Sequence, residues 1–110
     1  MTTRMTIFVG ADDRWRRGSL VDEIMRRARE RGLAGATVLH GIEGFGVHQR
    51  VHTDRILSLA EGLPVAVVIL DEDAVIREFL GELDELIVEG LVVLDPVEVV
   101  TLGGSKGDDR

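Results

Sequence analysis

The stretch Gly35-Ala36-Thr37-Val38-Leu39-His40-Gly41-Ile42-Glu43-Gly44-Phe45-Gly46 predicts a β-strand that runs directly into a loop interrupted by glycines. The glycines at positions 41, 44 and 46 allow positive φ angles and a close approach of the backbone to a bound group. Loops of this kind often carry ligand or partner contacts, although an ordinary hairpin exit has the same spacing. The remainder of the chain decides between these two interpretations.

Upstream of this stretch, the pattern predicts a strand, a polar loop and a helix. The strand covers Met5 to Val9 and is closed by Gly10, and the loop covers residues 11–18. Ser19 is the expected N-cap of the helix and Gly32 its expected end. Apolar residues recur at helical spacing between these two ends: Leu20, Val21, Ile24, Met25 and Ala28.

Downstream, a long connection leads to a third strand from Pro64 to Leu70. Residues 55–59 of this connection can extend a hairpin. A second helix follows, with Asp71 or Asp73 as its N-cap and Gly90 at its end. Its apolar face consists of Val75, Ile76, Phe79, Leu80, Leu83, Leu86 and Ile87. Its acidic residues are expected on the solvated face: Glu82, Asp84, Glu85 and Glu89. Two strand pieces close the chain, Leu91 to Leu94 and Val97 to Leu102, on either side of Asp95-Pro96.

The resulting order of elements is strand, helix, strand, strand, helix, strand. The segment Glu30-Arg31-Gly32-Leu33 after the first helix is echoed by Val88-Glu89-Gly90-Leu91 after the second, which suggests two related halves. This order predicts an α+β fold, a ferredoxin-like βαββαβ sandwich with both helices on one face of a four-stranded antiparallel sheet. We expect one domain over residues 1–102 and a flexible polar tail over residues 103–110.

The strand from Val65 to Leu70 is apolar at every position, whereas a strand with one solvated face alternates apolar and polar residues. Both faces of the sheet therefore need to be buried, and self-association through the open face is the simplest solution. A monomer in which the long connection covers the sheet is the alternative. The tail is too polar and too rich in glycine to cover it.

Composition excludes several classes of protein. The 110 residues contain no cysteine, so disulfides, thiolate metal sites and cysteine nucleophiles are absent. A net charge of −7 disfavours binding to nucleic acid. The apolar run near the N-terminus is too short for a signal peptide or a membrane span, so we expect a cytoplasmic protein that does not insert into membranes. Without a nucleophile elbow or a Walker loop, the sequence does not indicate an enzyme.

The chain resembles the DUF190 family of PII-like proteins. The residues that carry the resemblance extend over nearly the whole chain: Gly35-Ala36-Thr37-Val38, Gly41-Ile42-Glu43-Gly44-Phe45-Gly46, His52-Thr53, Leu63-Pro64 and Glu89-Gly90-Leu91-Val92. The resemblance implies a homotrimer whose three sheets line a central barrel. It also implies a small effector, usually an adenine nucleotide, in the cleft between neighbouring subunits. By position, the effector-binding residues are Gly41, Glu43, Gly44, Phe45, Gly46, His52, Glu89, Gly90 and Leu91.

The chain departs from the PII pattern in its charges. PII proteins hold the phosphates with basic residues after the second helix and on the last strand, where this chain has no Lys or Arg. Arg14, Arg16 and Arg17, which precede the N-terminus of the first helix, are a candidate replacement. A solvated loop with internally paired charges explains the same residues. Trp15 is either a platform on which a base stacks, a subunit anchor or part of the packing over the helix.

Three histidines, His40, His48 and His52, raise a metal-binding alternative. His48 and His52 are four residues apart, which suits a metal only in a helix, and the sequence fixes no third ligand. They are therefore minor candidates, and no cofactor is required.

The sequence as a whole predicts a PII-like regulator: a homotrimer that binds an effector and controls a partner, such as a membrane transporter or ion channel, through the loop from Gly41 to Thr53. A divalent-metal tolerance protein and a ligand-free trimeric assembly module are the alternatives.

Overall fold

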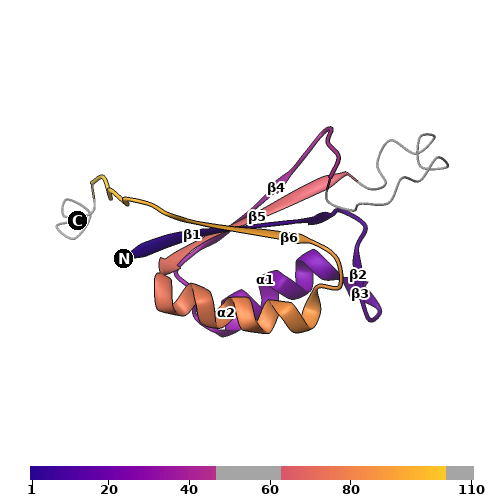
Figure 1. Ribbon diagram of the computed structural model, residues 1–110, viewed down its shortest axis with the longest axis horizontal. Helices are drawn as coiled ribbons and strands as arrows, with labels where there is room; N and C mark the ends of the chain where they lie inside the picture. The colour runs from indigo at the N-terminus through magenta and orange to yellow at the C-terminus, as the bar shows by residue number, and fades with distance from the viewer. Residues whose placement is uncertain (47–62, 104–110) are drawn as a thin grey trace.

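The computed structural model describes residues 1–46 and 63–103. It contains the long strands β1 (Thr2–Gly10), β4 (Ala36–His40), β5 (Pro64–Glu72) and β6 (Leu91–Pro96), the short strands β2 (Arg14–Trp15) and β3 (Gly18–Ser19), and the helices α1 (Leu20–Glu30) and α2 (Asp73–Leu86). The long strands form one antiparallel sheet in the order β4-β5-β1-β6. Both helices lie on the same face of this sheet (Figure 1). The predicted α+β fold and the order of its six main elements are confirmed.

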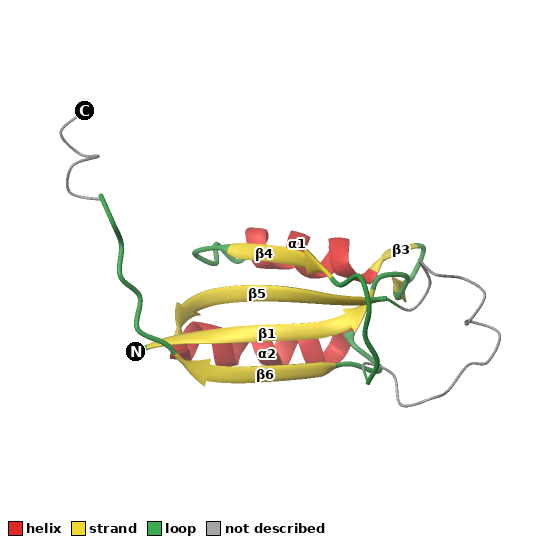
Figure 2. Cartoon of the chain, turned by 90° about the horizontal axis from the view of Figure 1, so that it is seen from above, coloured by secondary structure: helices red, strands yellow, loops and turns green. Residues whose placement is uncertain are grey.

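The two central strands determine the register of the sheet. β1 pairs with β5 from Thr2 opposite Glu72 to Gly10 opposite Pro64, and with β6 from Thr3 opposite Pro96 to Phe8 opposite Leu91. β4 is the other edge strand and pairs with β5. Figure 2 shows the four long strands side by side with the helices behind them. The polar segment 11–18, expected to be a loop, contains the β2–β3 hairpin instead.

Alternate residues of the central strands build the core. Their side chains are fully buried against the helices: Met5, Ile7, Val9, Val65, Val67 and Ile69. The helices contribute Leu20, Val21, Ile24, Ala28, Ile76, Phe79, Leu83 and Leu86. Burial of each large apolar side chain is worth about 1.5–3 kcal/mol relative to its exposure to water. The predicted apolar faces of both helices are confirmed, except that Val75 is 38% exposed.

The opposite face of the sheet carries both apolar and polar side chains, among them Thr6 and the ion pair of Arg4 with Asp95, and no described element covers it. Leu39 is 55% exposed, Leu91 53%, Val93 41% and Leu70 37%. Ala66 and Val68 point to this face as well, because they alternate with the buried positions of β5. The prediction that the third strand is apolar towards both faces is therefore confirmed.

The N-terminus of α1 follows the prediction and that of α2 does not. The hydroxyl of Ser19 accepts a hydrogen bond from the Asp22 N–H at 3.2 Å. At α2 the N-cap position belongs to Glu72, whose side chain makes no capping bond, so the expected caps at Asp71 and Asp73 were wrong. Their carboxylates have other partners. The hydroxyl of Thr3, which is 2% exposed, donates to Asp73 at 2.7 Å, and this bond together with Arg77 lowers the pKa of Asp73.

The end of α2 and the last strand also differ from the prediction. The helix ends at Leu86 and the following Ile87 is extended, so Gly90 is not the helix end. Residues 97–102 form no strand in the structure. The ladder between β6 and β1 stops at Pro96, opposite Thr3, and β1 offers no further partner beyond one hydrogen bond from the Val97 N–H to the Thr2 carbonyl. Of the predicted C-terminal tail, residues 104–110 lie outside the described residues.

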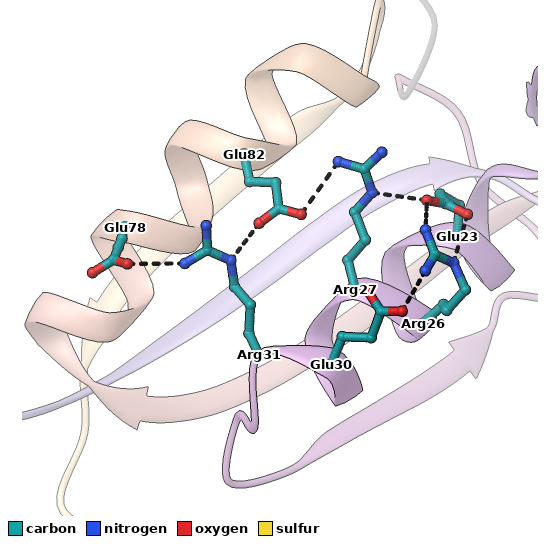
Figure 3. Close-up of polar contacts among 7 residues, drawn as sticks. All are labelled: Glu23, Arg26, Arg27, Glu30, Arg31, Glu78 and Glu82. Carbon is teal, nitrogen blue, oxygen red and sulfur yellow. Dashed lines mark hydrogen bonds and ion pairs between the residues drawn. The ribbon is translucent and has the colours of Figure 1, made fainter.

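A chain of ion pairs joins the two helices (Figure 3). The Glu82 carboxylate on α2 accepts hydrogen bonds from Arg27, at 3.2 Å, and from Arg31. Arg31 also pairs with Glu78. Glu82 was expected on the solvated face, but its side chain is only 18% exposed.

Arg27 extends this chain of ion pairs along α1. It donates to Glu23 at 2.8 Å, and the hydrogen bonds from Arg26 and Arg27 lower the pKa of Glu23 to about 2. Surface ion pairs contribute little when isolated, and a network of this kind contributes more. We therefore attribute the fixed spacing of the two helices partly to Glu82.

Replacing Glu82 with alanine tests this role. Glu82→Ala leaves Arg27 and Arg31 without their shared carboxylate, so we expect a clear decrease in Tm that becomes smaller in high salt. Glu85→Ala is the matched control, because Glu85 is exposed on the same helix. Equal Tm values for the two variants in thermal denaturation would show that the network does not hold the helices together.

Candidate functional site

Three of the segments expected to bind an effector lie at one end of the sheet. The register places the end of β1 beside the start of β5, and the end of β4 beside the same start, with Gly10 opposite Pro64 and His40 opposite Val65. β6 begins at this end too, with Leu91 opposite Phe8. The β2–β3 hairpin after β1, the segment 41–46 after β4 and the turn 87–91 before β6 therefore share this end (Figure 2).

The segment 41–46 turns around the ring of Pro64. The Gly41 N–H donates to the Pro64 carbonyl at 2.8 Å. A Cβ atom added at Gly41 would lie 2.7 Å from Cγ of Pro64, and one added at Gly44 would lie 2.8 Å from it. Real Cβ atoms essentially never come so close to another atom. Positions 41 and 44 are thus glycine because the backbone passes directly over a proline ring.

Beyond this turn the segment presents apolar side chains to solvent. Ile42 is 93% exposed and Phe45 is 100% exposed. Glu43 is exposed between them, and Gly46 has a φ of 101°, which favours glycine. His48 and His52 lie outside the described residues.

The turn between α2 and β6 packs tightly at Gly90. A Cβ atom at Gly90 would lie 2.8 Å from Cγ2 of Ile87 and 3.2 Å from the Phe8 carbonyl oxygen. Val88 is fully exposed beside it, and Leu91 is half exposed. An open groove of about 640 Å³ runs along α2 to this turn, and its lining includes Leu80, Gly81, Ile87, Gly90 and Val92.

In the β2–β3 hairpin, only part of the arginine cluster is available for an anion. The guanidinium of Arg14 donates to the Arg17 carbonyl at 2.7 Å and closes the turn. Arg16, with a positive φ of 56°, stacks on Trp15 with its Cζ 4.3 Å from the ring centroid. Arg27 of α1 also lies over this ring, at 5.1 Å. Arg17 is exposed, and its side chain makes no ion pair with the residues that the structure describes.

Trp15 is therefore a packing residue that joins the hairpin to α1. The sequence pattern does not indicate Arg27 as its partner. No local pattern indicates this contact, because it joins a hairpin residue to a helix residue 12 positions later in the chain.

The two remaining candidate effector-binding segments adjoin opposite edges of the sheet. The segment 41–46 follows the edge strand β4, and Glu89 and Gly90 precede the opposite edge strand β6. With β5 and β1 between them, the two segments are separated by three strand spacings, or about 14 Å. A single copy thus gathers the candidates at one end of the sheet without bringing them into one cleft.

Residues 1–46 and 63–103 contain neither a cluster of metal ligands nor a membrane-spanning helix. No group of three or more His, Asp or Glu side chains there is arranged to hold a metal ion. No helix there is long and apolar enough to cross a membrane.

Comparison with known proteins shows that the sequence of this chain matches one family. The model of the family DUF190, described as Uncharacterized ACR, COG1993, matches residues 2–99. A UPF0166 protein of Aquifex aeolicus is 36% identical over 98 residues, which cover 89% of this chain and 92% of that protein. A UPF0166 protein of Methanocaldococcus jannaschii is 30% identical over 96 residues, or 86% of this chain and 88% of that protein.

A solved structure shows the same fold. The crystal structure of a proposed PII-like signaling protein from Thermus thermophilus superposes with a TM-score of 0.63 at 17% identity, covering 98% of this chain and 93% of that one. At this identity the likeness concerns the fold.

A substitution at Gly44 tests the packing of segment 41–46 on Pro64. In the unaltered protein the Gly41 amide donates a hydrogen bond to the Pro64 carbonyl. Gly44→Ala forces the segment away from the proline ring, so we expect this amide to exchange its hydrogen faster in the variant. Gly35→Ala is the control, because a Cβ there meets nothing within 4 Å. Unchanged exchange in Gly44→Ala would contradict this description of the turn.

Proposed function

The chain belongs to the DUF190 family, and from this we propose that it is a PII-like regulatory protein: a homotrimer that binds a small effector between subunits and controls a partner protein. The proposed role is regulatory rather than catalytic. The likeness in fold to a proposed PII-like signaling protein supports the regulatory class.

The position of the candidate segments on opposite edges of the sheet carries this proposal. Segment 41–46 and the turn 87–91 lie at the same end of the sheet but are separated by two strands. Where the β4 edge of one copy approaches the β6 edge of another, the two segments come together, and a cleft between subunits forms. The exposed apolar face, with Leu39, Leu91 and Val93, supplies a reason for the copies to associate.

The arginines of the β2–β3 hairpin suit an anionic effector at this end of the sheet, where Glu43 and Glu89 oppose one, and an adenine nucleotide is our first candidate. Arg17 at the hairpin tip supplies a cation. Arg16 can join it by leaving the Trp15 ring. Backbone N–H groups of the glycine-rich segment 41–46 add donors for phosphate oxygens. In this arrangement the hairpin replaces the basic residues that PII proteins carry after the second helix.

Segment 41–46 is the proposed output of the regulator. Its base is fixed on Pro64, while Ile42 and Phe45 are exposed and available to a partner. An effector that contacts the base favours one arrangement of the exposed side chains and so changes the surface that the partner meets. A membrane transporter or ion channel is the proposed partner class. Residues 47–53, the rest of the loop expected to signal, lie outside the described residues.

A thermal-shift panel tests effector binding. The purified protein is heated with AMP, ADP, ATP and cyclic AMP, and with GTP and divalent metals for comparison. We expect an increase in Tm with an adenine nucleotide, because a ligand at 100 times its Kd adds about 2.7 kcal/mol of stability per site. Arg17→Ala is expected to reduce the shift by lowering the affinity. Arg29→Ala, an exposed residue beside Ala36 at the opposite end of the sheet, is expected to leave it unchanged.

Two results would contradict the proposal. A shift with metals alone favours a metal-binding protein, and the absence of a shift with any compound favours an assembly module without ligand.

A further inference from the structure

The β2–β3 hairpin turns at Arg16 and Arg17, and the backbone of the turn does not explain why position 16 is an arginine. β2 and β3 pair with Trp15 opposite Gly18, so these two arginines form the whole connection. Arg16 has a φ of 56°, and no other residue apart from glycine has a positive φ among residues 1–46 and 63–103. Glycine is preferred at such a position of a two-residue hairpin, because a side chain is strained there. The arginine side chain therefore needs a reason of its own.

Two guanidinium groups contact the ring of Trp15, and only one of them is anchored. The Cζ atom of Arg16 lies 4.3 Å from the ring centroid, and that of Arg27 lies 5.1 Å from it. Arg27 is held by the carboxylates of Glu23, at 2.8 Å, and Glu82, at 3.2 Å. Arg16 is exposed and makes no ion pair with any residue that the structure describes. Arg27 is thus fixed on the ring, whereas Arg16 can leave it.

The charges of the hairpin give Arg16 a reason to leave. Two guanidinium groups over one ring repel each other, so Arg27 weakens the contact of Arg16 with Trp15. Arg17 is exposed beside Arg16, while Arg14 is engaged with the Arg17 carbonyl at 2.7 Å. Charge-assisted hydrogen bonds from two arginines to one anion are stronger than an exposed cation–π contact. An anion at the tip therefore outcompetes the ring for Arg16.

The two acidic residues before the hairpin oppose this anion only in part. Asp13 is turned towards the backbone, where its carboxylate accepts a hydrogen bond from the Gly10 N–H at 2.9 Å. Asp12 is exposed and repels an anion. Residues 14–17 themselves contain three arginines and no carboxylate, so the tip of the hairpin stays cationic.

We propose that the hairpin is a latch operated by an anion: a diphosphate group that bridges Arg16 and Arg17 draws the Arg16 guanidinium off the Trp15 ring, while Arg27 stays on it. Each guanidinium fork then meets the oxygens of one phosphoryl group. The latch deepens the proposed function and rests on it for the effector, because it names the group that the effector presents to the hairpin and the motion that follows.

The latch connects the hairpin tip to the two helices. When Arg16 leaves the ring, the repulsion that it exerts on Arg27 is relieved, and Arg27 holds Trp15 more firmly. Arg27 also binds Glu82 of α2, so the change reaches the ion pairs that join α1 to α2. Binding of the anion is therefore expected to tighten the hairpin against α1.

Quenching of Trp15 fluorescence tests the latch, because Trp15 is the only tryptophan of the chain. Pyrophosphate is titrated at an ionic strength held constant with sodium chloride, and the quenching constant of acrylamide, a neutral quencher, is measured at each concentration. We expect this constant to increase and then to reach a plateau, because the part of the ring that Arg16 covers becomes accessible.

Two variants locate the response in the hairpin. Arg16→Gly suits the positive φ of the turn and uncovers the ring from the start, so we expect a high quenching constant that pyrophosphate does not change. Arg17→Ala removes one partner of the anion, so we expect the midpoint of the titration to rise about tenfold. Arg29→Ala, at the opposite end of the sheet, is the control and is expected to respond like the unaltered protein. Circular dichroism checks that each variant is folded.

A quenching constant that pyrophosphate leaves unchanged, or a response of Arg16→Gly equal to that of the unaltered protein, overturns the latch. The Tm measured with nucleotides separates this result from the proposed function. An increase in Tm with an adenine nucleotide, without any quenching response to pyrophosphate, overturns the latch alone. A quenching response to pyrophosphate that is lost in Arg16→Gly supports the latch, even where the absence of a Tm increase with every nucleotide overturns the proposed effector.

Discussion

The fold depends on a sheet in which the central strand β5 is apolar towards both faces, while only two helices are available among the described residues to cover it. Val65, Val67 and Ile69 of β5 are fully buried under the helices. The alternating residues Ala66 and Val68 point the other way, towards a face that no described element covers. The hydrophobic effect therefore forms the helix-covered layer and at the same time leaves a surface that favours a second copy. The topology adds two sheet edges that no strand among residues 1–46 and 63–103 pairs with, each with a groove beside it.

The amino-acid sequence was sufficient to predict the elements that rest on local patterns. Helical spacing of apolar residues predicted both helices, and Ser19 was recognised as a cap because its partner Asp22 is three residues away. The caps expected at Asp71 and Asp73 were wrong because Asp73 bonds instead to Thr3, a residue 70 positions distant. Features set by distant contacts of this kind cannot be read from a local pattern.

The same distinction explains the errors at charged and terminal positions. Glu82 has the spacing of a solvated residue, but the packing of α2 beside α1 places it between Arg27 and Arg31. Residues 97–102 have the composition of a strand, yet the ladder that would hold them ends where β1 begins. In the candidate site, glycines 41 and 44 were predicted as features of a binding loop. Their contact with the Pro64 ring appears only when β4 and β5 are paired. The proposed arrangement of these segments between subunits cannot be derived from the geometry of a single chain.

The mass of the particle in solution tests most directly the claim that the open face and edges are covered by further copies. Light scattering coupled to size-exclusion chromatography gives this mass without reference to shape. The account predicts a particle of three times the 12.1 kDa mass of one chain, maintained on dilution into the low micromolar range. A particle with the mass of one chain at all concentrations would contradict it, because the apolar face would then be stable in water.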